Sequence, residues 1–161
     1  MPTALVIETG SQSTTANSYI TVDGYKTYRD DRYGVGNNPS NDQITQYIYR
    51  AMSYFETLNF KGYKATEERP LQFPRSDLLI DGYGKDDDEI PVEVLEAMYE
   101  LVYAYETDNA PDKAVPRETI SESVNGVSVT YKSSSAHQTL TPAVTNALRK
   151  LIKPALQIAR V

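Results

Sequence analysis

Residues 60–78 read FKGYKATEERPLQFPRSDL, and this connector constrains how the rest of the chain can pack. Helices usually end in small polar turn residues. Here the segment instead carries aromatic residues at Phe60, Tyr63 and Phe73. Leaving such rings in water would forfeit roughly 1.5–3 kcal/mol of burial for each of them. We therefore expect the connector to pack back onto the helices that flank it.

The composition is that of a soluble globular chain. It has 161 residues, 40% hydrophobic and 24% charged, which indicates one domain with a core. No window approaches the roughly 18 apolar residues of a membrane span. The first residues lack a basic region, so we expect no signal peptide and synthesis in the cytosol. The absence of Cys excludes a disulfide framework, a thiol nucleophile and a Cys-based zinc site.

The charge balance is acidic. Lys plus Arg number 16 and Asp plus Glu number 22, giving a net charge of −6, which argues against a general nucleic-acid binder. No run of Lys or Arg suggests a local basic patch. Thirteen Tyr without any Trp is an unusual composition. Tyrosines bury area while keeping a polar group, so they suit either the rim of the core or an interface.

Two helices are predicted before the connector. Residues 4–7 form a strand or an extended arm, and Thr21 then caps a short helix that ends near Gly34. Ser40 and Gln43 have capping-box spacing and start a second helix. Its apolar stripe has the i, i+3, i+4 period of one buried face: Ile44, Tyr47, Ile48, Ala51, Phe55 and Leu58.

Two further helices are predicted after an acidic, glycine-containing loop at 81–89. Pro91 suits the first position of a helix that runs to about residue 107. Thr141 caps the last helix, and Pro154 kinks or ends it. The apolar stripes of these helices are Val94, Leu95, Met98, Leu101, Val102 and Tyr105 in the third, and Val144, Leu148, Leu151 and Ile152 in the fourth.

Between these two helices, Asn125-Gly126 has the preferred composition of a two-residue type I′ turn. Pairing Val124 with Val127 also sets Ile120 opposite Tyr131 and Glu122 opposite Val129. The apolar residues then share one face of a β-hairpin. A lone hairpin is marginally stable, so this face should pack on the chain's own helices or on a neighbour.

The patterns together predict a mainly α fold. A single domain, 1–161, contains a small bundle of about four helices at about 18–108 and 141–153. It also carries an appended β-hairpin at about 117–132 and extended termini, including a C-terminal tail at 154–161.

No enzyme or cofactor site is predicted. His137 shares a polar loop with Ser133, Ser134 and Ser135, whereas a catalytic serine needs a rigid turn and an acid-oriented histidine. The acidic run 86–89 could take calcium, but it lacks the alternating ligands of an EF-hand and suits the start of a helix. Neither a dinucleotide fingerprint nor a phosphate-binding loop occurs.

An ordered set of motifs resembles a family of small tailed-bacteriophage proteins, the head–tail connector adaptors or head completion proteins. Related phage sequences often carry the label DnaT-like single-stranded-DNA-binding protein. The resemblance covers about residues 16–152. Its motifs are Ala16-Asn17-Ser18-Tyr19-Ile20-Thr21, Arg50-Ala51-Met52-Ser53-Tyr54-Phe55, Phe60-Lys61-Gly62, Gln72-Phe73-Pro74-Arg75, Ile90-Pro91 and Val129-Thr130-Tyr131. Phe73 stands where such sequences most often have Trp, and the acidic segment 81–89 is a second departure.

The resemblance implies a structural virion protein. Such a protein forms a ring of adaptor copies, dodecameric in the family, between the portal protein and the next neck or tail protein. Genomic double-stranded DNA passes through the ring without specific binding. The expected location is the virion neck, after synthesis in the host cytoplasm, with no membrane partner.

The residues that we expect at partner interfaces lie in three segments. The tail contributes Leu156, Ile158, Arg160 and Val161, the hairpin contributes Val124, Val127 and Val129, and the connector contributes Lys61 and Arg75. Family adaptors often reach the portal with their C-terminal segment, although the tail could also pack on its own bundle.

The alternative function is single-stranded nucleic-acid binding, as the DnaT-like label suggests. It requires basic residues beside aromatic stacking platforms. Tyr63, Phe73, Lys61 and Arg75 form the one such cluster that the sequence nominates.

Overall fold

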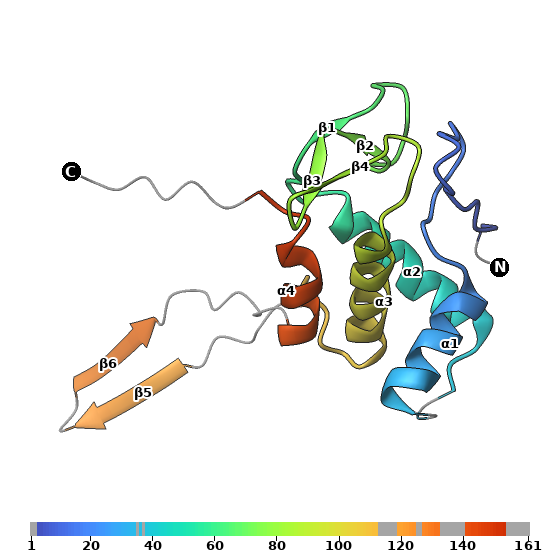
Figure 1. Cartoon of the computed structure of the whole chain (residues 1–161). Helices are drawn as coiled ribbons and strands as arrows, with labels where there is room; N and C mark the ends of the chain where they lie inside the picture. Colours follow the sequence, from blue (N-terminus) through green and yellow to red (C-terminus); the bar gives the residue numbers. More distant parts are fainter. Residues whose placement is uncertain are drawn as a thin grey trace, which may run out of the picture.

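The structure, a computed structural model, describes residues 3–34, 36, 38–112, 119–124, 127–132 and 141–153. Within these ranges the chain forms four α-helices and three separate two-stranded sheets (Figure 1). The helices are α1 (Val22–Tyr33), α2 (Asn41–Phe55), α3 (Val92–Glu106) and α4 (Pro142–Arg149). The strands are β1 (Tyr63–Lys64), β2 (Arg75–Ser76), β3 (Leu78–Ile80), β4 (Tyr83–Lys85), β5 (Thr119–Val124) and β6 (Val127–Lys132). The predicted mainly helical fold with a β-hairpin is confirmed.

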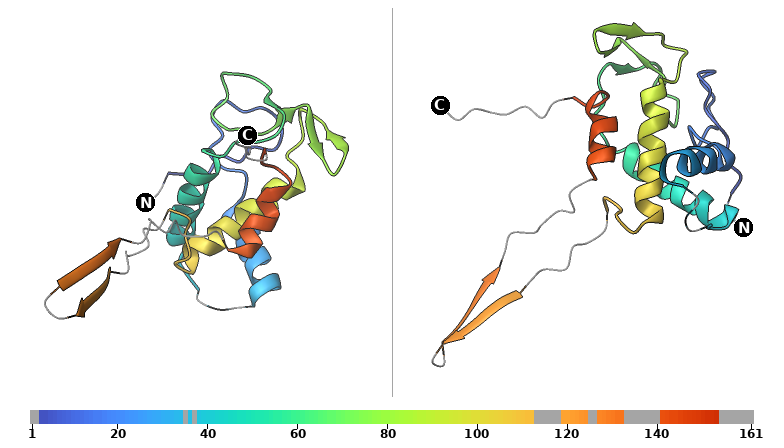
Figure 2. Two further views of the ribbon diagram at one scale, coloured as in Figure 1. Left: turned by 90° about the vertical axis from the view of Figure 1, so that its left-hand side faces the viewer. Right: turned by 60° about the horizontal axis from the view of Figure 1, so that its bottom comes forward.

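Helix α3 is the centre of the bundle. It contacts α1, α2 and α4, and Figures 1 and 2 show α4 on one side of it and α1 on the other. A helix surrounded by neighbours must be apolar on most of its circumference. The sequence of α3 meets this condition, because Val94, Met98, Leu101 and Val102 are all fully buried. The predicted stripe therefore forms the core.

The predicted helix starts are largely confirmed. The hydroxyl of Thr21 accepts a hydrogen bond from the Gly24 N–H, and Ser40 forms a complete capping box with Gln43. Thr141 caps α4 in the same way. Pro91 is the exception, because it precedes α3 with an extended ψ of 143° and is the cap residue, not the first helical residue.

The N-terminal segment is extended and is tied to the residues just before α1. Ile7 forms a parallel bridge with Ser18, and the Glu8 N–H donates to the Ser18 carbonyl at 2.8 Å. The Glu8 carboxylate, itself 3% exposed, accepts hydrogen bonds from the backbone N–H groups of Gly10, Gln12 and Ser13. This buried carboxylate organises the loop that follows the predicted extended arm.

The connector contains structure that the sequence patterns did not predict. Strands β1 and β2 pair antiparallel, with Tyr63 opposite Ser76, and β3 pairs with β4, with Ile80 opposite Tyr83. The prediction of a loop throughout 81–89 is therefore wrong for 83–85. A strand of two or three residues carries too little periodic signal to be found in a sequence.

The predicted packing of the connector is correct for two of its three aromatic residues. Phe60 and Phe73 are 1% and 0% exposed, but Tyr63 is 68% exposed. The expectation that all three rings pack inward is therefore wrong for Tyr63. Tyr63 lies in β1, where successive side chains point to opposite faces of the pair.

The register of the β-hairpin is as predicted. Val124 pairs with Val127, Glu122 with Val129 and Ile120 with Tyr131. Strands β5 and β6 make no extensive contact with any other described helix or strand. The turn residues 125–126 and the tail 154–161 lie outside the described residues.

Candidate interaction surface

The end of α4 is joined to the connector by main-chain hydrogen bonds. Phe60 and Ile152 form an antiparallel bridge. The Lys61 N–H donates to the Leu151 carbonyl at 2.9 Å, and the Lys153 N–H donates to the Asn59 carbonyl at 2.8 Å. These bonds bring together two segments that are far apart in the sequence, since Lys61 and Lys150 are separated by 89 positions.

This junction gathers four cations, Lys61, Arg149, Lys150 and Lys153, which we call the basic patch. The Lys61 ammonium donates to the Lys150 carbonyl at 2.8 Å, and Lys150 forms an ion pair of 2.6 Å with Asp81. The hydrogen bond from Lys150, with the charges of Lys150, Lys61 and Arg149, lowers the pKa of Asp81. One carboxylate therefore lies within the field of three cations.

An exposed aromatic ring lies beside the basic patch. The ammonium of Lys153 is 5.9 Å from the centre of the Tyr63 ring, which is within cation–π range. The patch thus combines positive charge with an accessible aromatic face. No run of Lys or Arg suggested this patch in the sequence, although three cations lie within residues 149–153.

Beneath the patch, a cluster of aromatic rings anchors the connector. The Phe73 ring centre lies 4.9 Å from that of Phe60 and 6.0 Å from that of Phe55. The Tyr19 hydroxyl donates to Glu56 at 2.8 Å and accepts from the Phe73 N–H at 3.0 Å. Burial raises the pKa of both Tyr19 and Glu56. The connector that carries Lys61 of the basic patch is therefore fixed to the core by packed rings and by hydrogen bonds.

Arg75 belongs to this fixed connector. It is 7% exposed, and its guanidinium donates to the carbonyl oxygens of Lys61 at 2.8 Å and Gly62 at 3.0 Å. It also donates to the side-chain oxygen of Gln72 at 2.7 Å. Burial lowers the pKa of Arg75. A partner contact was predicted for this residue, but its donors are used to brace the connector.

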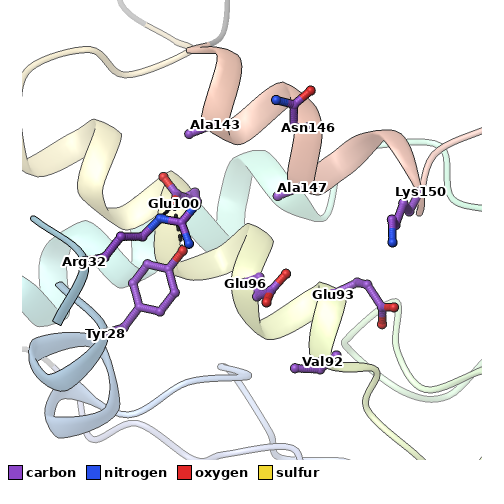
Figure 3. A pocket seen from close by; sticks show the side chains of 10 residues that line it. All are labelled: Tyr28, Arg32, Val92, Glu93, Glu96, Glu100, Ala143, Asn146, Ala147 and Lys150. Atoms are coloured by element: carbon purple, nitrogen blue, oxygen red, sulfur yellow. Dashed lines mark hydrogen bonds and ion pairs between the residues drawn. The ribbon is translucent and has the colours of Figure 1, made fainter.

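A groove of about 390 Å³ lies between α1, α3 and α4, next to the basic patch (Figure 3). Three acidic residues of α3, Glu93, Glu96 and Glu100, line it, and Arg32 and Lys150 stand towards its two ends. The groove is thus acidic along its length and flanked by a cation at each end.

Glu100 is satisfied within the chain. It is 3% exposed, and its carboxylate accepts hydrogen bonds from the hydroxyls of Tyr28 at 2.7 Å and Tyr33 at 2.7 Å. Arg32 adds an ion pair at 3.1 Å. Burial and the hydrogen bond to Glu100 raise the pKa of Tyr33 to about 12. Glu100 therefore holds α1 to α3.

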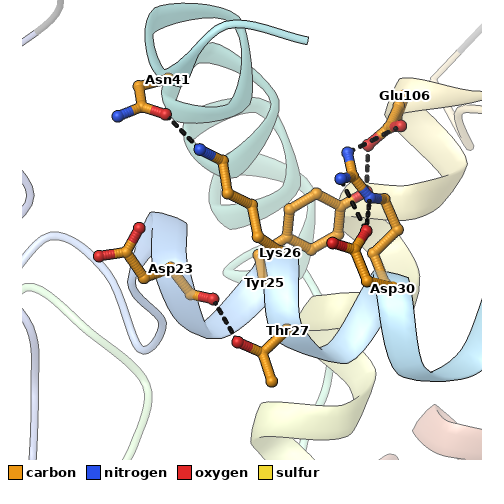
Figure 4. A network of polar contacts seen from close by, with 8 residues as sticks. Asp23, Tyr25, Lys26, Thr27, Asp30, Asn41 and Glu106 are labelled. Carbon is orange, nitrogen blue, oxygen red and sulfur yellow. Dashed lines mark hydrogen bonds and ion pairs between the residues drawn. The ribbon is translucent and has the colours of Figure 1, made fainter. Parts of the chain in front are cut away.

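A second carboxylate, Glu106, whose side chain is 6% exposed, repeats this arrangement at the last residue of α3 (Figure 4). It accepts a hydrogen bond from the Tyr25 hydroxyl and forms an ion pair of 3.4 Å with Arg29. Arg29 also pairs with Asp30 at 2.8 Å. The sequence analysis did not single out either carboxylate; the signal for Glu100 is its position between the buried stripe residues Met98 and Leu101.

The contacts described above do not bring the predicted interface residues of the hairpin and the tail to this surface. The backbones of Val124, Val127 and Val129 lie in the paired strands of the hairpin. Leu156, Ile158, Arg160 and Val161 lie outside the described residues, as do His137 and its neighbouring serines. Lys61 is the predicted connector residue that contributes its charge to the surface.

The described part of the chain shows no group of three His, Cys, Asp or Glu side chains arranged to hold a metal ion. Among the described helices, none has the length and apolar character needed to cross a membrane.

The chain was compared with family models, curated proteins and solved structures. A family model described as "Putative DnaT-like ssDNA binding protein" matches residues 3–161. No curated protein and no solved structure matches the chain.

Proposed function

The chain belongs to the DnaT-like ssDNA binding protein family, and from that premise we propose that it is a structural head–tail adaptor of a tailed-bacteriophage virion. In this role, copies of the chain form a ring between the portal protein and the next neck or tail protein. The ordered motifs from Ala16 to the final helix support the proposal through their resemblance to phage connector sequences.

The observation that carries the proposal is the β-hairpin. Strands β5 and β6 pair with each other and make no extensive contact with the other described elements. A two-stranded hairpin is marginally stable alone and needs a further apolar surface. Described residues of the bundle and the connector form one hydrophobic cluster. An adaptor supplies the missing surface from a neighbouring subunit or from the portal.

The charge of the chain also supports passage of DNA through the ring without binding. The net charge is −6, and a strongly basic lumen would instead hold the phosphates of the genome.

The test uses Gly126→Val together with the portal protein encoded by the same genome. A type I′ turn requires positive φ, where a β-branched residue costs on the order of 1–2 kcal/mol. We expect the variant to keep its helical circular dichroism but to lose attachment to portal-bearing capsids. Gly84→Val is the matched control, because a Cβ at Gly84 meets no atom within 4 Å.

Three outcomes would count against the proposal. Normal attachment of Gly126→Val would show that the hairpin has no role in assembly, and absence of the protein from electron-microscopy maps of the virion neck would exclude the adaptor role altogether. Loss of the helical signal in Gly126→Val would show that the hairpin belongs to the core.

The second candidate function is single-stranded DNA binding, which the basic patch favours. Exposed Tyr63 beside Lys153 offers a ring for base stacking and a cation for phosphate. Of the other predicted members of this cluster, Phe73 and Arg75 are buried. A fluorescence anisotropy titration with an oligonucleotide at low salt decides between the functions. Submicromolar affinity with a steep salt dependence would favour DNA binding.

A further inference from the structure

We infer that the basic patch of one copy of this chain binds the acidic turn of the next copy, where the acidic turn is residues 86–89. The ring rests on the proposed function, but the contact itself is argued from surfaces of the single chain. A closed ring requires two different, complementary patches on each subunit, because each subunit presents one patch to each neighbour.

Within the chain, Lys150 of the basic patch is balanced by Asp81 and by the nearby Glu93 and Glu96, whereas two other cations of the patch form no ion pair with a described residue. Asp81 pairs with Lys150 and is the one carboxylate that forms an ion pair there among the described residues. Arg149 and Lys153 are both exposed, and neither forms an ion pair with a described residue. The 2.6 Å contact with Asp81 shows that the patch accepts an aspartate at close range.

The acidic turn is the complementary surface. Asp86, Asp87, Asp88 and Glu89 are consecutive and exposed, and none of them forms an ion pair with a described residue. Such a run repels itself in water and is stabilised by an external cation. A set of cations held in one place is therefore its natural partner.

The N-terminal loop holds the backbone of the acidic turn in place, and a fixed backbone favours a defined contact. Gly10 packs so tightly against the Asp88 carbonyl oxygen that a Cβ at Gly10 would lie 1.8 Å from it. The side-chain amide of Gln12 donates to the Asp87 carbonyl at 3.3 Å. The N-terminal loop thus supports the backbone of the turn while its carboxylates point to solvent.

The two surfaces lie on different sides of the molecule. The basic patch is at the end of α4, and the acidic turn precedes α3 next to the N-terminal loop, on the opposite side of α3 in Figures 1 and 2. Among the described residues, no ion pair joins the two surfaces within one chain. This placement gives a head-to-tail contact, the type that closes into a ring.

The exposed Tyr63 ring completes the interface. It lies at the patch beside Lys153 and is 68% exposed. Tyrosine is enriched at protein–protein interfaces. Its ring is uncharged, and its hydroxyl can form a hydrogen bond. A neighbouring copy would cover this ring and place its carboxylates on the surrounding cations.

The first test identifies the contact chemically. Equal amounts of ¹⁴N- and ¹⁵N-labelled protein are mixed at low salt and treated with a carbodiimide, which joins a lysine to a carboxylate in direct contact. We expect mixed-isotope peptides that link Lys61, Lys150 or Lys153 to residues 86–89. Absence of such peptides, or links only within one isotope, would overturn the inference.

The second test swaps the charges. Arg149→Glu with Lys153→Glu cancels the positive charge of the patch, and Asp86→Lys with Asp87→Lys cancels the negative charge of the turn. Each variant alone should self-associate at least about tenfold more weakly in sedimentation velocity, because the attraction between the two surfaces is lost and the new side chains face like charges. A one-to-one mixture should recover affinity, since the introduced glutamates of one variant then pair with the introduced lysines of the other.

The control is Lys26→Glu with Arg50→Glu, which makes the same change of net charge on α1 and α2. Equal weakening by this control, or no recovery in the mixture, would show that net charge and not the contact is responsible. Loss of oligonucleotide binding by the patch variant with unchanged self-association would assign the patch to nucleic acid and overturn the inference.

The two proposals can fail separately. If the charge-swapped mixture recovers self-association but the wild-type protein never binds portal-bearing capsids, the contact stands and the adaptor function fails. If the wild-type protein binds capsids and the patch variant binds them equally well in complete rings, the function stands and the contact fails.

Discussion

Phe73 shows at the scale of one residue why the connector holds its shape. Its ring is 0% exposed and lies between Phe60 and Phe55, while its backbone N–H donates to the Tyr19 hydroxyl at 3.0 Å. The side chain and the backbone of this residue are thus both fixed by the core. The neighbouring Arg75 is fixed in the same way by carbonyl oxygens of residues 61 and 62.

We predict that Phe73→Ala destabilises the protein by about 3–5 kcal/mol, because it leaves a cavity among tightly packed rings. Urea unfolding measures the change. Tyr63→Ala is the matched control and should change the free energy of unfolding by no more than about 0.5 kcal/mol, since Tyr63 is largely exposed. Similar small changes in both variants would show that Phe73 is not part of the core.

We predict that the free energy of unfolding falls at high pH, because tyrosines with raised pKa values hold α1 to α3. The pKa of Tyr33 is raised from 10.0 to about 12 by burial and by its hydrogen bond to Glu100. A phenol whose folded pKa is raised stabilises the fold fully below the unfolded pKa. This contribution is lost as the pH rises from 10 towards 12, because the unfolded chain then releases its proton first.

The measurement is the free energy of urea unfolding as a function of pH, with phenolate absorbance followed in parallel. We expect a decline across this window and a shallower decline in Tyr33→Phe, which has no proton to release. An identical slope in the two proteins would contradict the assignment of Tyr33.

At the scale of elements, the connector is a pair of short sheets and not an irregular loop. The β1–β2 pair requires a tight backbone at Gly62, whose φ is +68°. The same segment carries Lys61 to the end of α4, where the hydrogen bonds to residues 150 and 151 form. The geometry of the basic patch therefore depends on this glycine.

We predict that Gly62→Ala destabilises the protein by about 1–3 kcal/mol. An added Cβ would lie 2.5 Å from the Ser76 carbonyl oxygen, and its φ is unfavourable for alanine. Gly84→Ala is the control, because its Cβ meets no atom within 4 Å and its φ is not positive. Thermal unfolding compares the two, and an equal melting temperature for both variants would contradict this reading.

At the scale of the whole molecule, one core joins the bundle and the connector. Buried residues from the four helices and the connector form a single hydrophobic cluster. Strands β5 and β6 make no extensive contact with the other described elements, and the proposed function assigns the hairpin and the tail after Lys153 to assembly.

We predict that a chain ending at Lys153 folds and remains soluble but fails to attach to portal-bearing capsids. The prediction that Pro154 kinks or ends the last helix is wrong, because α4 already ends at Arg149. The tail contains Leu156, Ile158 and Val161, apolar residues that a partner can cover. In the full-length chain, Leu156→Glu with Ile158→Glu should have the same effect, and Gln157→Glu should not. Cosedimentation with capsids measures attachment, and normal attachment of the truncated chain would refute the prediction.

The sequence by itself determined the local features of this protein. Helix starts at Thr21, Ser40 and Thr141 depend on side-chain caps within three residues of each N–H. The hairpin register depends on two adjacent turn residues, and each buried stripe depends on a 3.6-residue period. Such features need no knowledge of distant contacts, because the interacting groups are neighbours in the chain.

Only the tertiary structure decided the surfaces on which the candidate site rests. Lys61 and Lys150 lie 89 positions apart, and the hydrogen bonds at the end of α4 bring them together. Arg75 looked like a surface cation, yet carbonyl oxygens from residues 61 and 62 make its burial favourable. Tyr63 looked like a core residue, yet the pleat of β1 leaves it exposed. Each outcome depends on which distant segments of the chain contact each other. The pattern of neighbouring residues in the sequence does not determine those contacts.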